Sequence, residues 1–288
     1  MQNAECRMQN ELATDGPAIL HSAFGILQFF AFALGAIIGS FLNVVIHRYP
    51  REESIVFPPS RCPHCDEPIR WYDNIPLLSF IVLLGRCRAC RQPILWRYPL
   101  VELANALFYL AIFLHTGPQV AFLFLAAIVS MLITLIYIDA EIQILPDVID
   151  VPGIAVGLAI GALGLWRSAP TLMLSDSWLD AVAGAAVGAG IVAAIIGAYW
   201  LVRRIEGMGW GDSKMLAMIG ALVGWRAVVG VLLVGSITGA LIGVPIALRS
   251  REGMQLAVPF GVFLGFGALV VLFFGHTLSG WYLSLMLR

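Results

Sequence analysis

Long apolar runs alternate with short polar segments along almost the whole chain. Runs of roughly 17–25 apolar residues are long enough to cross a bilayer as helices. They lie near residues 22–46, 99–115, 119–138, 148–166, 179–202, 214–224, 226–248 and 259–278. Within lipid only helices or closed barrels satisfy every backbone polar group, and these runs lack the alternating pattern of barrel strands. The pattern predicts an all-α polytopic membrane protein with about eight transmembrane helices.

Composition supports this interpretation and excludes one large soluble domain. Of the 288 residues, 60% are hydrophobic and 12% are charged, whereas soluble domains are about half apolar and about a quarter charged. The net charge is −1 and the charges are sorted by loop, so no nucleic-acid partner is expected. Residues 1–20 are polar and of mixed charge, without the basic start of a signal peptide. The first apolar run is therefore expected to remain as an anchor.

Lys and Arg residues gather in three of the predicted loops, 47–98, 203–214 and 249–258. Loops 116–118 and 225 are nearly free of cations, and loop 167–178 holds only Arg167. Cytosolic loops of membrane proteins carry the excess of basic residues. With eight spans all three basic loops fall on the cytosolic side and both termini fall outside, which supports keeping 214–224 and 226–248 as separate spans.

The loop at 47–98 contains two paired cysteine motifs, Cys62-Pro-His-Cys65 and Cys87-Arg-Ala-Cys90. Two C-x-x-C turns can supply the four thiolates of a tetrahedral zinc site. Four thiolates leave no open position for water, so the predicted zinc is structural rather than catalytic. A redox pair or two disulfides is the alternative, which a reducing cytosol disfavours.

Two aspartates lie at predicted span ends on the cytosolic side. Asp139 follows the third span and Asp212 opens the sixth. Two carboxylates in proximity share one proton, so one can act as a general base toward water and the other as an acid toward a carbonyl. Gly209 and Gly211, which precede Asp212, would let a peptide backbone approach closely.

Simpler roles remain open for these acidic residues. Asp212 alone is also expected as a helix N-cap, and Asp139 alone could pair with an arginine. An ion-coupled transporter would keep its acidic groups nearer the midplane. The secondary candidates are Glu102, either functional or paired with Arg97; Asp147, either catalytic or capping the fourth helix; and Glu141 and Asp150, solvated or capping.

The chain resembles the bacterial type IV prepilin peptidases, which are intramembrane aspartyl proteases of the Gly-x-Gly-Asp kind, from about residue 35 to 262. The motifs that carry the resemblance are "GSFLNVVIHRYP" (39–50), the paired knuckles, "DNIPLLSF" (73–80), "RYPLVELANALF" (97–108), "IDAEIQILPD" (138–147) and "GMGWGDSKMLAMIGA" (207–221). One departure is "PFGV" (259–262), because many members have a second proline where this chain has Val262.

The resemblance implies residue roles and an activity. Asp139 and Asp212 correspond to the catalytic aspartates, with Pro146, Asp147, Gly209, Gly211 and Lys214 near the site, and Cys62, Cys65, Cys87 and Cys90 correspond to the zinc ligands. The implied enzyme cleaves leaders of prepilins and pseudopilins just after a glycine. It then methylates the new N-terminal residue, usually phenylalanine, with S-adenosylmethionine, whose binding residues stay unassigned. The implied setting is the bacterial inner membrane, with periplasmic termini and a cytosolic active site, in type IV pilus biogenesis or type II secretion.

Spans and motifs together predict four segments of the chain. These are a polar periplasmic tail (1–20), an N-terminal domain (21–115) with the cytosolic zinc loop (47–98), an aspartyl peptidase membrane core (119–248), and a last span with a C-terminal tail (249–288). Two functions of other classes remain as alternatives. One is an ion-coupled transporter with a zinc-stapled loop, which would show inverted repeats, and the other is a non-enzymatic assembly scaffold.

Overall fold

A computed structural model describes residues 2–204, 209–249 and 259–286, and most of this part is helical. The principal helices are α1 (Gln2–Arg48), α3 (Arg97–Thr116), α4 (Val120–Ile142), α5 (Asp147–Ala162), α6 (Trp178–Arg203), α7 (Trp210–Val223), α8 (Trp225–Arg249) and α9 (Phe260–Met286). The loop between α1 and α3 holds the short helix α2 (Leu78–Val82) and the 3-10 turns Tyr49–Arg51 and Trp71–Asn74. Across the described ranges β-pairing is limited to two isolated bridges in this same loop.

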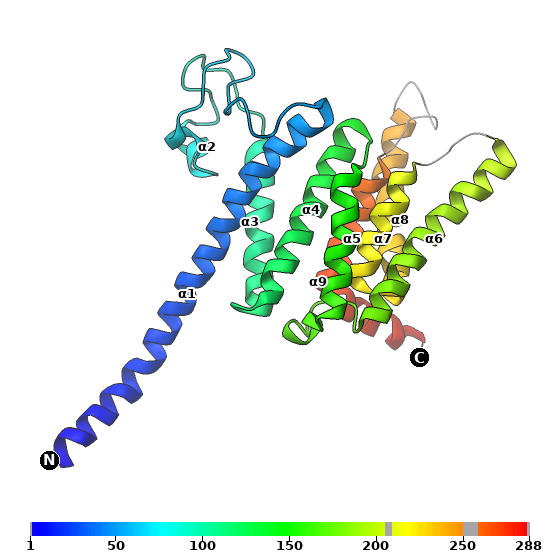
Figure 1. The fold of residues 1–288 in the computed structure, drawn as a ribbon. Coiled ribbons are helices and arrows are strands. Elements are labelled where there is room, and N and C mark those ends of the chain that lie inside the picture. Colours follow the sequence, from blue (N-terminus) through cyan, green and yellow to red (C-terminus); the bar gives the residue numbers. More distant parts are fainter. Residues whose placement is uncertain (1, 205–208, 250–258, 287–288) are drawn as a thin grey trace.

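The helices run up and down between two ends of one bundle (Figure 1). The loop that carries the cysteines lies at one end, together with the turn from α4 to α5 and the starts of α7 and α9. The first turns of α1 and the last turns of α9 lie at the opposite end. This arrangement places every predicted site residue at one end of the bundle.

Six of the described helices are long and apolar enough to cross a membrane. Their spans are Phe24–Arg51, Arg97–Thr116, Val120–Ile142, Trp178–Val202, Trp225–Ile246 and Phe260–Trp281. The protein is therefore an all-α multi-pass membrane protein, as predicted. The remaining two predicted spans coincide with α5 and α7, which are shorter, so the number of eight crossings stays a prediction.

Helix α7 is an interior helix that its neighbours surround. Its 14 residues extend about 21 Å at 1.5 Å per residue, less than the hydrocarbon core of about 30 Å. Every residue from Met215 to Val223 is buried. A Cβ added to Gly220 would lie 2.1 Å from the carbonyl oxygen of Gly184 on α6, so the two backbones touch. Such close approach of small residues is how helices associate in membranes, and it fixes the helix that carries Asp212.

Few of the predicted segment boundaries can be compared with the described residues. Helix α1 begins at Gln2, so the predicted polar tail is helical over residues 2–20. Most of the predicted basic loop 249–258 and residues 205–208 of the loop 203–214 lie outside the described residues. The division into four segments stays a prediction.

Candidate functional site

Asp139 lies on α4, one turn before that helix ends at Ile142, and its residue is only 4% exposed. Its Oδ2 accepts a hydrogen bond of 2.9 Å from the N–H of Val262, and the N–H of Gly261 donates to the same carboxylate. Both donors lie in the first turn of α9, where backbone N–H groups have no partner within the helix and the dipole favours negative charge. The Asp139 side chain on α4 therefore accepts hydrogen bonds from two backbone N–H groups that begin α9.

Asp212 lies in the first turn of α7 and its residue is 9% exposed. The preceding Gly211 faces Leu145, and a Cβ added to that glycine would lie 2.8 Å from the Leu145 Cβ. Leu145 also reaches the start of α9, because a Cβ added to Gly261 would lie 3.2 Å from its Cδ1. One leucine thus fills the space between the starts of α7 and α9.

The packing around Leu145 brings the two aspartates together. The charges of Asp139 and Asp212 are close enough to repel each other, which is the condition for a pair that shares one proton. The expected proximity of these carboxylates is therefore present. Leu145 occupies the space beside Gly211, whereas the side of Gly209 is open except for the N atom of Gly211 at 3.9 Å. The role of the two glycines in substrate approach stays a prediction.

The Leu-Pro-Asp element joins α5 to α7. Pro146 occupies the N-cap position of α5, and Asp147 is the first residue of that helix. Both carboxylate oxygens of Asp147 accept from the Lys214 ammonium, at 2.6 and 2.7 Å. Lys214 is two residues after Asp212 on α7, so this ion pair links the start of α5 to the helix that carries Asp212.

Three simpler roles considered for the acidic residues are wrong. The N-cap of α7 is Gly209 rather than Asp212. The N-cap of α5 is Pro146 rather than Asp147, and no side chain forms a capping hydrogen bond there. Asp150 is neither solvated nor capping, because it is fully buried and neither carboxylate oxygen has a hydrogen-bond partner. Asp150 lies within electrostatic reach of Asp147, Lys214 and Asp212.

The pairing expected between Glu102 and Arg97 is also wrong. Arg97, at the start of α3, forms an ion pair with Glu141, two residues beyond Asp139. Glu102 instead accepts a hydrogen bond of 2.8 Å at Oε2 from the N–H of Leu77 in the cysteine loop. Glu141 therefore fixes the end of α4 against α3, and Glu102 fixes the loop against α3.

The four cysteines of the loop form one cluster, with all four sulfur atoms within 4.8 Å of one another. The Sγ atoms of Cys62 and Cys90 are 3.8 Å apart, and none of the four forms a disulfide. Sulfurs that surround zinc as a tetrahedron at about 2.3 Å lie about 3.8 Å apart. The arrangement fits a closed zinc site.

The two knuckles are structural repeats, a feature that was not predicted from the sequence. The stretches "RCPHCDEPI" (61–69) and "RCRACRQPI" (86–94) share Arg, Cys, Cys, Pro and Ile at the same spacing. Equivalent hydrogen bonds close them: Cys62 N to Glu67 O (3.0 Å) and Cys87 N to Gln92 O (2.9 Å), then Asp66 N to Cys62 O (2.9 Å) and Arg91 N to Cys87 O (3.1 Å). Each knuckle contributes two thiols in the same local geometry.

Two of the thiols have pKa values shifted in opposite directions. Hydrogen bonds from the backbone of Cys90 and Ala89 lower the pKa of Cys87 to about 7. A backbone hydrogen bond at Glu67 acts in the same direction on Cys65, but loss of hydration and its hydrogen bonds with the three other thiols raise the pKa of Cys65 to about 12. Four thiolates at this spacing need a positive charge between them, which Zn²⁺ would supply.

The contribution of α9 to the aspartate site was not predicted from the sequence. Gly261 and Val262 contact Asp139 from 122 and 123 positions away in the chain, counted from their numbers. The departure at Val262 was the available signal, because a proline there would have no N–H to donate.

Comparisons with known proteins agree with this architecture. Residues 33–116 match the family model "Bacterial Peptidase A24 N-terminal domain", and residues 126–244 match the model "Type IV leader peptidase family". No solved structure matches the chain significantly.

Curated relatives match over most of the chain. A protein of Aeromonas hydrophila is 36% identical over 277 residues, covering 88% of this chain and 92% of the relative. A protein of Pseudomonas putida is 36% identical over 86% of this chain and 91% of its own length. A protein of Myxococcus xanthus is 43% identical over 77% of this chain and 63% of the relative. All three are named prepilin leader peptidase/N-methyltransferase. The chain described here belongs to the type IV leader peptidase family.

Proposed function

We propose that this protein is a membrane-embedded prepilin leader peptidase and N-methyltransferase. The observation that carries the peptidase activity is the buried pair Asp139 and Asp212, brought together from α4 and α7 at one end of the bundle. The names of the relatives support the second activity, and the cysteine loop matches the N-terminal family model. These names support neither ion transport nor a purely structural role.

In the proposed reaction the two carboxylates share one proton and act on a bound water. The ionised aspartate takes a proton from water while the water oxygen bonds to the scissile carbonyl carbon. The protonated aspartate gives its proton to the carbonyl oxygen. When the carbon–nitrogen bond breaks, the aspartate that now holds the proton gives it to the leaving nitrogen. The other aspartate takes a proton from a hydroxyl of the tetrahedral intermediate, so the pair again holds one proton. The N–H of Val262 favours negative charge on Oδ2 of Asp139, which suits this residue to the ionised state.

The substrates are prepilins or pseudopilins, cleaved just after a glycine on the cytosolic side of the bacterial inner membrane. The basic residues at the aspartate end support this orientation, because cytosolic loops carry the positive excess. The termini are then periplasmic, and the products serve type IV pili or type II secretion. Zinc held by Cys62, Cys65, Cys87 and Cys90 is structural. S-adenosylmethionine, when bound, supplies an electrophilic methyl group for the N-terminal amine, usually of phenylalanine, that cleavage releases.

The test is cleavage of a purified prepilin by the purified protein. We expect Asp139→Asn and Asp212→Asn each to lower the cleavage rate by about 10²–10⁴-fold, the usual range for loss of an acid or base. Asp66→Asn is the matched control, since Asp66 is exposed on the cysteine loop and asparagine suits its positive φ. Parental cleavage by a folded Asp139→Asn or Asp212→Asn variant would exclude the dyad.

A further inference from the structure

A cavity of about 390 Å³ lies between the cysteine loop and the ends of α1 and α3. Helix α1 contributes Asn43 and His47, helix α3 contributes Tyr98 and Glu102, and the loop covers them with residues that include Cys62 and Cys87. The volume is in the range of small-molecule sites, about 300–1,000 Å³. None of the lining residues is Asp139 or Asp212, so the cavity is separate from the aspartate pair.

The cavity contains a buried hydrogen-bond acceptor that has no partner. Asn43 is 3% exposed, and its side-chain NH₂ donates to the carbonyl oxygens of Tyr98 (3.0 Å) and Gly39 (3.3 Å). These two bonds fix the amide so that its Oδ1 is the free end, and that oxygen accepts no hydrogen bond. Buried polar atoms in native proteins are nearly always paired, so this acceptor suits a ligand that donates or carries positive charge.

Glu102 adds a carboxylate to the same cavity. It is 9% exposed and receives hydrogen bonds from the N–H of Leu77 and from Ser40. Both partners are neutral, and the arginine five residues earlier, Arg97, is paired with Glu141 instead. An acidic group without a cationic partner at a low-dielectric site favours a cationic ligand.

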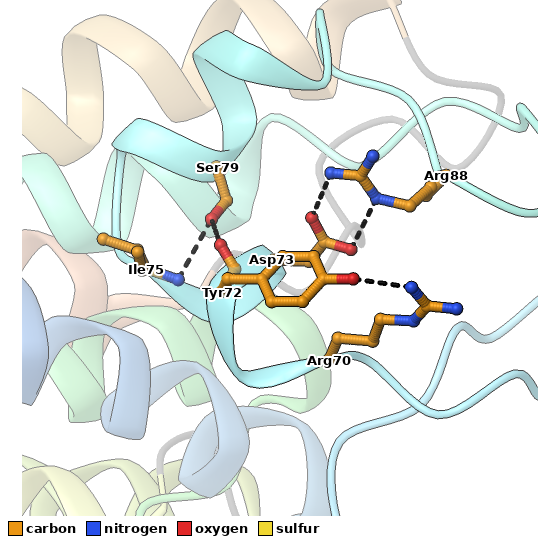
Figure 2. A network of polar contacts seen from close by, with 6 residues as sticks. All are labelled: Arg70, Tyr72, Asp73, Ile75, Ser79 and Arg88. Atoms are coloured by element: carbon orange, nitrogen blue, oxygen red, sulfur yellow. Dashed lines mark hydrogen bonds and ion pairs between the residues drawn. The ribbon is translucent and has the colours of Figure 1, made fainter.

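The cavity lining combines apolar side chains with cationic ones. Phe80, Leu95 and Tyr98 offer surface for a flat ring, while Arg48 and Arg61 add positive charge elsewhere in the lining. Figure 2 shows how the wall is fixed to the second knuckle. The Arg88 guanidinium donates two hydrogen bonds to the carboxylate of Asp73, at 2.6 and 2.7 Å, and the Ser79 hydroxyl donates to the carbonyl oxygen of Tyr72 at 3.1 Å. The zinc knuckles and the cavity wall are therefore one structural unit.

We propose that this cavity binds the methyl donor S-adenosylmethionine, with Glu102 and Asn43 accepting its positively charged end. The molecule has a flat adenine ring, a cationic sulfonium with an ammonium nearby, and a carboxylate, which match the apolar wall, the Glu102 and Asn43 acceptors and the cationic side chains. The assignment rests on the proposed methyltransferase function. The freed α-ammonium of a cleaved pilin shares the same positive charge, and the experiment separates the two ligands.

The experiment measures equilibrium binding to the zinc-loaded full chain in nanodiscs. Labelled S-adenosylmethionine is compared with S-adenosylhomocysteine, whose sulfur is neutral, and with a pilin peptide that has a free N-terminal amine. We expect Glu102→Gln, which keeps an acceptor for the Leu77 N–H, to weaken S-adenosylmethionine binding by about 10-fold or more and binding of the neutral analogue much less. Glu52→Gln is the matched control, because Glu52 is exposed and does not line the cavity; its affinities should equal those of the parent.

A second pair of variants tests the cavity by filling it. Leu95 lines the cavity and is 61% exposed, whereas Leu78 is similarly exposed and does not line it. We expect Leu95→Trp to weaken binding of both nucleosides and Leu78→Trp to leave binding unchanged. Prepilin cleavage by each variant shows that the bundle is folded.

Three results would overturn the assignment. If Glu102→Gln and Leu95→Trp bind S-adenosylmethionine as the parent does while the parent methylates cleaved pilin, the donor site lies elsewhere and the proposed function stands. If the variants lose affinity only for a pilin peptide with a free α-amine, the cavity binds the methyl-accepting N-terminus instead of the methyl donor. If the parent neither binds nor transfers the methyl group, the methyltransferase function itself fails, and the inference fails with it.

Discussion

The cysteine loop and the aspartate site lie at the same end of the molecule but are built in different ways. The four cysteines come from 29 consecutive residues, 62–90, and two copies of one short motif supply them. The aspartate site draws on α4, α7 and α9 and on the turn before α5, and its contacts join residues 123 positions apart. Local sequence can build the first site, whereas only the packing of the bundle builds the second.

This difference predicts that the two activities can be separated. Damage to the cysteine loop should remove methyl-donor binding and leave peptide cleavage, because the cavity wall depends on the knuckles and the aspartates do not. Damage to the start of α9 should lower peptide cleavage and leave methyl-donor binding. The following variants test this separation in order of expected effect.

Cys87→Ser should have the largest effect. Removal of one thiolate opens the closed zinc site, and the free energy that metal binding contributes to folding of the loop is lost. We expect zinc content to fall below half of the parental value and S-adenosylmethionine affinity to fall by about 100-fold or more, while prepilin cleavage stays within about threefold. Metal analysis, equilibrium binding and a cleavage assay measure the three quantities.

Cys6→Ser is the control for that variant, because Cys6 is far from both knuckles in the sequence. Unchanged zinc content in Cys87→Ser would exclude a four-thiolate site. Equal losses of binding and cleavage would show that the two regions are one functional unit.

Gly261→Ala should damage the aspartate site and spare the cysteine loop. The new methyl group would lie 2.9 Å from Asp139 Oδ2 and 3.2 Å from Leu145 Cδ1, so the carboxylate or the start of α9 must shift. We expect cleavage to fall by about 10- to 100-fold, as small misplacements of catalytic groups do, with zinc content unchanged. Gly190→Ala is the control, since nothing lies within 4 Å of the added atom there; a similar loss in both variants would refute the close contact.

Val262→Pro should have a smaller effect on the same carboxylate. Proline is tolerated in the first turn of a helix but removes the N–H that donates to Asp139 at 2.9 Å. We expect kcat for cleavage to fall by about 3- to 10-fold, the cost of one typical net hydrogen bond, with little change in KM. Val262→Ala keeps the N–H and should cleave at the parental rate, so equal losses in both variants would assign the effect to packing.

Asp73→Asn should have the smallest effect and act only on the loop. The paired hydrogen bonds from Arg88 lower the pKa of Asp73 in the folded protein. The stability that this interaction contributes is therefore complete above the ordinary aspartate pKa of about 3.9. It is lost as the pH falls through the lower pKa of Asp73 in the folded protein. We expect the substitution to lower the local stability of the loop by about 0.5–1 kcal/mol near neutral pH, since the arginine is half exposed. Amide hydrogen exchange of residues 70–90 measures this, and a difference that persists unchanged in strong acid would contradict it.

Sequence patterns predicted the features that depend on local order. Apolar runs located the helices because a membrane helix must present about 20 apolar residues in succession. The C-x-x-C turns indicated the metal site because tight turns bring two thiols together wherever they occur. The charged side chains were harder to assign: Arg97 pairs with Glu141 rather than with Glu102, and Asp150 is buried without a partner. The choice of partner depends on which helix ends meet, and spacing along one helix does not encode that.

The sequence by itself determined that this is a helical membrane protein with a four-cysteine knuckle pair and two aspartates at helix ends. Only the tertiary structure decided that Leu145 fills the space between α7 and α9, that Val262 donates to Asp139, and that Asn43 and Glu102 line one cavity beneath the knuckles. The physical reason is that hydropathy and short motifs act over a few residues, whereas a buried carboxylate takes its hydrogen bonds from whichever helix start is packed against it.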